Sequence, residues 1–255
     1  MSASSVKAIR SYWDRRAHIY AEVRKKKEWF KKVDQRVSDL IDASTCSLIL
    51  DIGTGPAIFP IKIAKANNAI IVGVDISKRS LKIAKNQIKK EKLANKIHLI
   101  TATADALPFQ ENSFAAVTSI LTIHHLPPRR MENSFKEFSR VLKLKGKLVL
   151  VEDWASEPRT YFQQVIYKLR KILMRSEIEE YHTTYCEYVA MIERSGLKIF
   201  AVEFHPRQVD LARFEVLNSP EAHKLLEKAE KIEQHQQTID TTFLGAVKPA
   251  LYRTA

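Results

Sequence analysis

The stretch Ser47-Leu-Ile-Leu-Asp-Ile-Gly-Thr-Gly55 joins a short apolar run to a glycine-rich turn. The apolar run predicts a buried strand, and glycines directly after a strand let a ligand lie against the backbone because no side chain stands in the way. A dinucleotide-binding turn has a third glycine three positions after the second, where this chain has Ile58, and it needs no acid two residues before its first glycine, where this chain has Asp51. Asp51 therefore separates this turn from a dinucleotide-binding one.

On both sides of this stretch, short apolar runs alternate with longer amphipathic segments, and no internal repeat interrupts the pattern. Such an alternation predicts strands and helices in turn around a mostly parallel sheet, which is the α/β class. We expect strands at 47–52, 69–75, 96–100, 114–120, 147–153, 197–204 and 241–247.

Capping residues mark the ends of several expected helices. Ser77 suits the N-cap of an amphipathic helix, and Thr184-Tyr-Cys-Glu187 is typical of a capping box. A helix that follows Pro127-Pro128 is expected to end near Lys145-Gly146, because glycine suits a C-terminal cap. Ser219-Pro220-Glu221 predicts the start of one more helix.

Two further acids follow the second and third expected strands. Asp75 comes twenty positions after Gly55, where a carboxylate accepts hydrogen bonds from both ribose hydroxyls. Asp105 lies in Thr103-Ala-Asp-Ala-Leu-Pro108, a position from which it can contact an adenine amino group. Each acid alone could equally form a turn or a cap. The spacing of all three acids, together with the glycines, favours a cofactor that contains adenosine.

These features resemble the class I S-adenosylmethionine-dependent methyltransferases, and most of all the branch that includes the ubiquinone and menaquinone C-methyltransferases. The resemblance also rests on Phe114 to Leu126, on Phe138 to Val151 and on Tyr12 to Tyr20, a segment similar to the branch's N-terminal helix. It implies a Rossmann-like, seven-stranded, mostly parallel sheet in the order 3-2-1-4-5-7-6, with helices on both faces. It further implies an N-terminal helical segment (1–46) that covers the cofactor site and a methyltransferase domain (47–255), to which this chain adds helical inserts at about 156–180 and 206–240 at the carboxyl edge.

The resemblance assigns roles to ten residues around the cofactor S-adenosyl-L-methionine. Asp51 would orient the methionine amino group beside Gly53, Thr54 and Gly55, Asp75 would hold the ribose, and Ile76 would pack on the adenine. Asp105 and Ala106 would read the adenine edge, Ile120 would line the methionine end, and the aromatic ring of Tyr20 would close over the cofactor. Two positions depart from the family pattern: Ala57 replaces the third glycine of the loop, and Leu144-Lys-Gly146 replaces a proline-glycine turn.

No motif in the chain fixes a catalytic group. Methyl transfer needs alignment and desolvation of a nucleophile but no obligatory acid or base. His124 and His125 follow the fourth expected strand at the ligand-binding edge, where one of them could deprotonate the acceptor or both could be structural. Cys46 and Cys186 stand far apart with no metal-binding spacing, so we expect no metal site.

The composition leaves the acceptor open. Lys and Arg outnumber Asp and Glu by 42 to 29, which gives a formal charge of +13 and invites an anionic partner such as RNA. No membrane-spanning segment or signal peptide is visible, so we expect a cytoplasmic protein, monomeric or homodimeric, without stable membrane insertion. We favour a small-molecule or lipid-like acceptor. RNA or protein methylation, a non-catalytic cofactor-binding subunit and a nicotinamide-dependent oxidoreductase stay as alternatives.

Much of the positive charge falls on helices that flank the expected sheet, where charged residues usually form solvated faces. Only Arg24 to Lys27 and Arg129-Arg130 are expected near the active-site edge. The charge argument therefore reduces to whether these two clusters meet an anionic acceptor.

Overall fold

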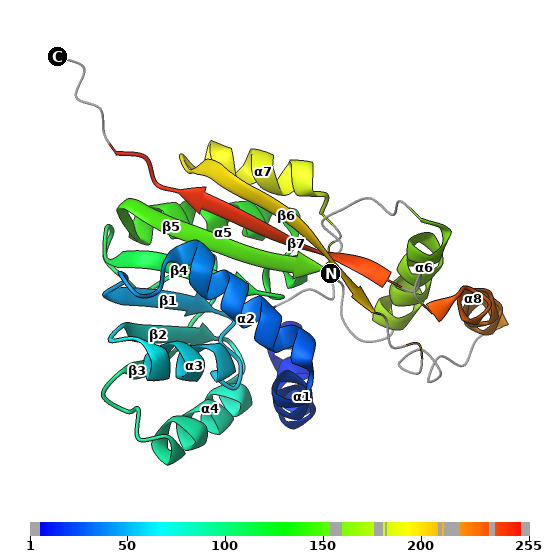
Figure 1. Cartoon of the computed structure of the whole chain (residues 1–255), viewed down its shortest axis with the longest axis horizontal. Coiled ribbons are helices and arrows are strands. Elements are labelled where there is room, and N and C mark those ends of the chain that lie inside the picture. The colour runs from blue at the N-terminus through cyan, green and yellow to red at the C-terminus, as the bar shows by residue number, and fades with distance from the viewer. Residues whose placement is uncertain are drawn as a thin grey trace.

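Seven strands form one sheet in the order β3-β2-β1-β4-β5-β7-β6 (Figure 1). The computed structural model describes residues 6–153, 160–175, 181, 183–208, 211, 220–234 and 238–250. All neighbours from β3 to β5 are parallel, whereas β7 runs antiparallel to both β5 and β6. The expected class and strand order are confirmed. The strands are β1 (Leu48–Ile52), β2 (Ile70–Asp75), β3 (Ile97–Thr101), β4 (Phe114–Ile120), β5 (Leu142–Asp153), β6 (Lys198–Gln208) and β7 (Thr238–Val247).

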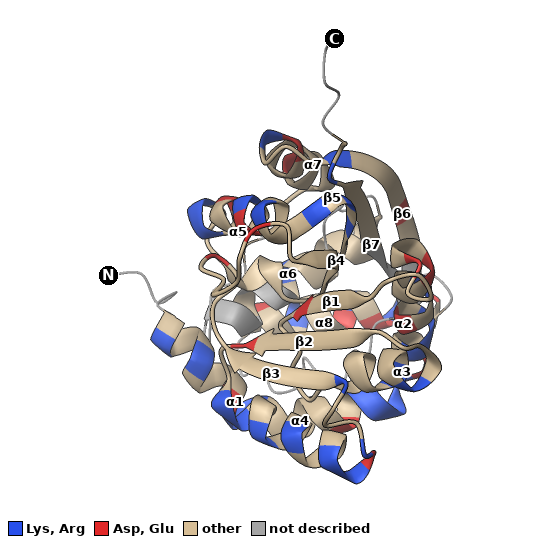
Figure 2. Ribbon diagram, turned by 90° about the vertical axis from the view of Figure 1, so that its left-hand side faces the viewer, with Lys and Arg blue, Asp and Glu red and all other residues tan. Residues whose placement is uncertain are grey.

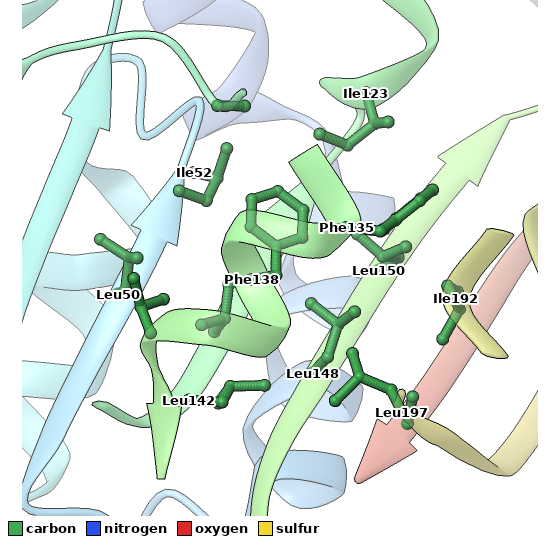
Figure 3. Close-up of a cluster of buried hydrophobic side chains, with 14 of the residues drawn as sticks. Leu50, Ile52, Ile123, Phe135, Phe138, Leu142, Leu148, Leu150, Ile192 and Leu197 are labelled. Atoms are coloured by element: carbon green, nitrogen blue, oxygen red, sulfur yellow. The ribbon is translucent and has the colours of Figure 1, made fainter. Parts of the chain in front are cut away.

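Helices pack on both faces of the sheet (Figure 1). They are α1 (Val6–Lys26), α2 (Glu28–Ile41), α3 (Ile58–Ala66), α4 (Lys78–Lys90), α5 (Pro128–Val141), α6 (Tyr161–Arg175), α7 (Tyr185–Arg194) and α8 (Pro220–Glu230), with a short 3-10 turn η1 (Ile123–His125). Successive strand residues point to opposite faces, so each strand supplies side chains to two apolar layers. Leu148 and Leu150 of β5 pack toward α5 and α7 (Figure 3), and Val149 and Val151 pack toward α2 and α3.

The expected caps at Ser77 and Thr184 are present. The Ser77 hydroxyl accepts a hydrogen bond from the Ser80 N–H at 3.0 Å, at the N-terminus of α4. Thr184 and Glu187 form the reciprocal bonds of a capping box at the start of α7. These caps fix where the two helices begin relative to the sheet.

The expected helix end near Lys145-Gly146 is wrong, because α5 ends at Val141 and β5 begins at Leu142. Lys145 has φ 64°, and the pairing of β4 with β5 shifts register between Phe114 and Ala116, so the first residues of β5 form an irregular, bulged start. A Cβ on Gly146 would lie 2.8 Å from the backbone oxygen of Lys143. Close approach of two backbone segments, and not a helix cap, requires this glycine.

The two segments predicted as inserts contribute α6 and α8, which pack on each other through an apolar cluster separate from both sheet layers. β6 and β7 continue pairing as far as Gln208 and Thr238, whereas β5 and β7 pair only as far as Asp153 and Thr241. The hairpin therefore extends beyond the carboxyl end of β5 on the way to α8. Within the predicted inserts, residues 156–159, 176–180, 209–210, 212–219 and 235–237 lie outside the described residues.

Lys and Arg residues are frequent along α1, α4 and α5 (Figure 2). Within the described part of the chain, no helix is both long and apolar enough to cross a membrane.

Candidate cofactor and active site

A hollow of about 780 Å³ opens at the carboxyl edge of β1, β2 and β4 and is covered by α1. A smaller hollow of about 290 Å³ adjoins it and shares Tyr20, Gly53 and Ile120 with it. Nine of the predicted site residues line one or both hollows: Tyr20, Asp51, Gly53, Thr54, Gly55, Asp75, Ile76, Ile120 and His125. Asp105, Ala106 and His124 lie outside the lining.

The glycine turn after β1 is held by the backbone of the neighbouring strand. The N–H groups of Gly53 and Thr54 both donate to the Val74 carbonyl, at 2.8 and 3.0 Å. Gly53 has φ 67°, and a Cβ there would lie 2.1 Å from the Thr122 hydroxyl oxygen. Only glycine fits this position. Ala57, at the end of the turn, has φ 58°, so alanine occupies a left-handed conformation where the family pattern has glycine.

Asp75 closes β2 and faces the larger hollow. Its carboxylate accepts hydrogen bonds from the backbone N–H groups of Gly55 at 2.8 Å and Ser77 at 2.7 Å. Burial raises the pKa of Asp75 to about 6, although the two backbone bonds favour the charged form. A carboxylate fixed by two N–H donors still has lone pairs for ligand hydroxyls, so it can hold a ribose.

Asp51 and Arg24 line the smaller hollow together. The Thr118 hydroxyl donates to Asp51 at 2.8 Å, and burial raises the pKa of Asp51 to about 6. Arg24 is only 6% exposed, forms a two-bonded pair with Asp34 of α2, and lies over the Phe30 ring. This hollow therefore presents an acid and a guanidinium side by side, as a zwitterionic amino-acid group requires.

Arg24 was absent from the predicted cofactor residues. A signal for it exists in the sequence, because Ile9, Tyr12, Ala17, Ala21 and Arg24 recur at helical spacing and are the buried positions of α1. Arg24 therefore lies on the inward stripe of the helix, and its basic neighbours Lys25 to Lys27 are exposed.

α1 is fixed to the N-terminus of α4 by polar contacts. The Asp14 carboxylate accepts from the Ser77 hydroxyl at 2.7 Å and from the Arg79 N–H at 3.1 Å, a favourable place for negative charge at a helix N-terminus. Arg10 donates to the Ile76 carbonyl at 3.1 Å. These contacts place the Trp13 ring in the wall of the larger hollow.

Asp105 follows β3 and forms an ion pair with Arg130 of α5. Both Asp105 oxygens accept from the guanidinium, at 2.6 Å each. Arg130, and not Asp105, lines the hollow, whereas Ala106 is exposed and its N–H donates to the Thr103 carbonyl at 3.2 Å. Their predicted contact with adenine is untested by this geometry. Arg24 and Arg130, the two inward-facing members of the basic clusters, are thus both paired with carboxylates.

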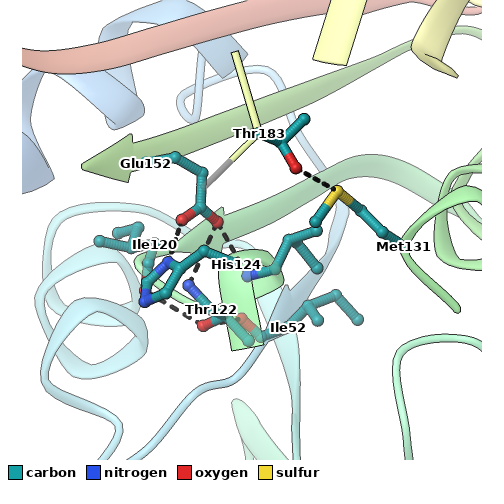
Figure 4. Close-up of polar contacts among 8 residues, drawn as sticks. Ile52, Ile120, Thr122, His124, Met131, Glu152 and Thr183 are labelled. Carbon is teal, nitrogen blue, oxygen red and sulfur yellow. Dashed lines mark hydrogen bonds and ion pairs between the residues drawn. The ribbon is translucent and has the colours of Figure 1, made fainter. Parts of the chain in front are cut away.

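The two histidines lie side by side in the turn after β4, with ring centroids 4.1 Å apart. His125 lines the larger hollow and meets the Trp13 ring edge-on at 5.2 Å. His124 donates through Nδ1 to Glu152 of β5, which is fully buried (Figure 4). The same carboxylate accepts from the N–H groups of Ile123 at 2.8 Å and Thr122 at 3.2 Å.

The Glu152 carboxylate therefore holds the whole turn and points a histidine pair toward the edge of the hollow. Among the described residues, no group of three His, Cys, Asp or Glu side chains could bind a metal ion.

This sheet order, with its single antiparallel strand and its ligand hollow at the carboxyl edge, defines a class I methyltransferase fold. Residues 49–146 match the family model of a methyltransferase domain. The chain is 32% identical over 162 residues to a demethylmenaquinone methyltransferase of Lactococcus lactis, an alignment that covers 60% of this chain and 61% of the relative. It is 33% identical over 121 residues to the ubiquinone/menaquinone biosynthesis C-methyltransferase UbiE of Geotalea uraniireducens, covering 47% and 50%.

Among solved structures, the [4+2]-cyclase SpnF superposes with a TM-score of 0.70 at 16% identity, over 98% of this chain and 99% of that one. The methyltransferase domain at 49–146, these relatives and the fold together support a class I S-adenosylmethionine-dependent methyltransferase, with S-adenosylmethionine as its cofactor. It spans between 43% and 61% of the length of the first three curated relatives that it matches.

Proposed function

We propose that the protein transfers a methyl group from S-adenosylmethionine to a small-molecule or lipid-like acceptor. The observation that carries the proposal is the pair of adjoining hollows, which share Tyr20, Gly53 and Ile120 and contain Asp75 on one side and Asp51 with Arg24 on the other. A ribose-binding acid and an amino-acid-binding pair at opposite ends match the two polar ends of this cofactor.

In this proposal, Asp75 binds the ribose hydroxyls, and Asp51 and Arg24 hold the methionine ammonium and carboxylate. Tyr20 and Ile120 line both hollows and therefore flank the junction between nucleoside and amino acid. The N-terminal segment, 1–46, covers the cofactor, and residues 47–255 form the methyltransferase domain. When bound, the cofactor supplies an electrophilic methyl group on a sulfonium.

We assign the proton-accepting role to His125, because it lines the hollow, and a positioning role to His124. Nδ1 of His124 donates to Glu152, and the Glu152 carboxylate also holds the backbone of the turn. This arrangement keeps the histidine pair at the place where an acceptor hydroxyl, nitrogen or acidic carbon loses its proton as the new bond to the methyl carbon forms.

An apolar acceptor suits the lining of the larger hollow. Its wall includes Val6, Ile9, Trp13 and Leu126, and the two relatives described above act by name on quinone precursors. We place the inserts, about 156–180 and 206–240, around the acceptor. The RNA and protein alternatives rest on surface charge alone.

Two measurements test this function. Calorimetry is expected to detect micromolar binding of S-adenosylhomocysteine and no binding of NAD, and the reverse would contradict the proposal. Incubation with methyl-labelled S-adenosylmethionine and fractionated extract is expected to place label in small metabolites or lipids. Label in RNA or protein would overturn the acceptor class. Tight cofactor binding without any label would favour a protein that keeps the fold for another purpose, as a cyclase does on this fold.

A further inference from the structure

Arg130 connects the hollow to the loop after β3. It lies in the first turn of α5, where its N–H donates to the Pro127 carbonyl at 2.8 Å and its carbonyl accepts from the Ser134 hydroxyl at 2.9 Å. The guanidinium reaches Asp105 with two parallel bonds of 2.6 Å, and the two side chains are 22% and 14% exposed. Such a planar, two-bonded pair fixes the carboxylate in orientation as well as in position.

α5 holds the rest of this loop as well. Glu137 accepts from the Leu107 N–H at 2.8 Å, and Arg140 donates to the carbonyls of Leu107 and Phe109 at 3.1 and 2.7 Å. The loop that carries Asp105 is therefore positioned by side chains of α5. Among these, Arg130 alone lines the hollow.

A carboxylate has about four lone-pair positions, and a two-bonded guanidinium uses one on each oxygen. The Thr103 side chain also donates to this carboxylate, so an adenine amino group would share Asp105 with Arg130 and Thr103. Burial would raise the pKa of Asp105, but the hydrogen bonds and the charge of Arg130 outweigh burial and hold that pKa below its ordinary value. Asp105 is therefore kept ionised and oriented beside the hollow.

We propose that Arg130 is a positioning residue that aims Asp105 at the exocyclic amino group of the adenine and thereby sets the preference of the site for a 6-aminopurine. The proposal rests on the function proposed above, in which Asp105 reads the adenine edge. In this proposal, purine selectivity depends on Arg130 of α5, which lies 25 positions after Asp105, the acid that contacts the purine.

Calorimetry with two ligands tests this role: S-adenosylhomocysteine, and S-inosylhomocysteine, in which a carbonyl replaces the amino group. The wild-type protein is expected to prefer the adenine ligand. Arg130→Ala is expected to weaken S-adenosylhomocysteine about tenfold, the usual effect of losing charge-assisted hydrogen bonds, and to remove most of the preference. Arg130→Lys keeps the positive charge but cannot form two parallel hydrogen bonds. Its affinity and its preference are expected to lie between those of the wild type and those of Arg130→Ala. Arg129→Ala is the matched control, because it removes an exposed charge one position earlier on the same helix.

The outcomes separate the possible roles of Arg130. A loss of affinity that is equal for both ligands would indicate a merely structural role and overturn the proposal. Unchanged or tighter binding by Arg130→Ala would show that the ion pair blocks the adenine position, and would also overturn it. Failure of the wild-type protein to bind S-adenosylhomocysteine would instead refute the proposed function. A thermal melt of each variant establishes that it is folded.

Discussion

The two turns that build the site, one after β1 and one after β4, are held in different ways. The turn after β1 is fixed by backbone, since the N–H groups of Gly53 and Thr54 share one carbonyl of β2. The turn after β4 is fixed by a side chain, because the buried Glu152 carboxylate accepts from two backbone N–H groups and from His124. The first turn demands glycine at position 53, because φ there is 67° and the Thr122 side chain of the second turn lies against it, whereas the second turn demands an acid on the neighbouring strand. Cofactor binding and proton transfer should therefore respond to different substitutions.

The largest effect is expected from Gly53→Ala, which adds a methyl group against Thr122 at a residue with φ 67°. We expect the free energy of unfolding to fall by about 3 kcal/mol, and affinity for S-adenosylhomocysteine to fall about 100-fold, because the strained turn cannot keep its shape. Denaturant unfolding and calorimetry measure the two losses. The control is Ala57→Gly in the same turn, which relieves a left-handed alanine and should change stability by less than about 1 kcal/mol. Wild-type affinity in Gly53→Ala would refute the backbone-held turn.

A smaller and more selective effect is expected from Glu152→Gln. The amide oxygen of Gln can still accept from the two backbone N–H groups, but the amide nitrogen cannot accept from Nδ1–H of His124, so His124 loses its acceptor. We expect methyl transfer to the labelled acceptor fraction to slow by about 30-fold, roughly 2 kcal/mol, while affinity for S-adenosylhomocysteine changes less than threefold. Glu203→Gln, on β6 beside Arg36, is the control. Equal loss of binding and turnover would show that the two turns do not act separately.

The smallest effect concerns pH and the acid at the end of β1. Burial raises the pKa of Asp51 to about 6 in the folded protein, above its ordinary value of 3.8. As pH rises from about 4 to 6, Asp51 ionises in the unfolded chain before it ionises in the folded protein, so its contribution lowers the free energy of unfolding progressively. Above about pH 6 this loss stays constant. Asp51→Asn is expected to raise the free energy of unfolding at pH 8 by about 1 to 2 kcal/mol, with no gain near pH 4.

Urea unfolding of the ligand-free protein at both pH values measures this difference. The Asp39→Asn substitution, which removes an exposed carboxylate from α2, serves as the control. Cofactor affinity of Asp51→Asn should fall as its stability rises. If the free energy of unfolding of Asp51→Asn differs from that of wild type by the same amount at pH 8 and pH 4, burial of the Asp51 carboxylate does not have the assigned cost.

Much of the fold could be predicted from local pattern. Apolar runs and the caps at Ser77 and Thr184 depend on residues within one element, and periodicity reports them directly. The expected helix end at Gly146 failed because a glycine that caps a helix and a glycine that allows two backbone segments to approach look alike in sequence.

The site was predictable where it depends on the carboxyl ends of successive strands, since parallel pairing alone brings Asp51 and Asp75 to one edge. The partners of the site residues were not predictable. Arg130 lies 25 positions from Asp105, and Glu152 lies 28 positions from His124. Such pairs arise from the packing of whole elements, which no local pattern contains. The roles of the individual cofactor residues stay predictions.

The β6–β7 hairpin has a consequence for how acceptor range changes among related enzymes. Its pairing continues past the end of β5, and the α6–α8 cluster shares no residue with the two sheet layers. A segment attached through an extended ladder can be exchanged without repacking the sheet. Because α8 packs on α6, the segments to exchange together in protein engineering are about 156–180 and 206–240, while the glycine turn and its acids stay untouched.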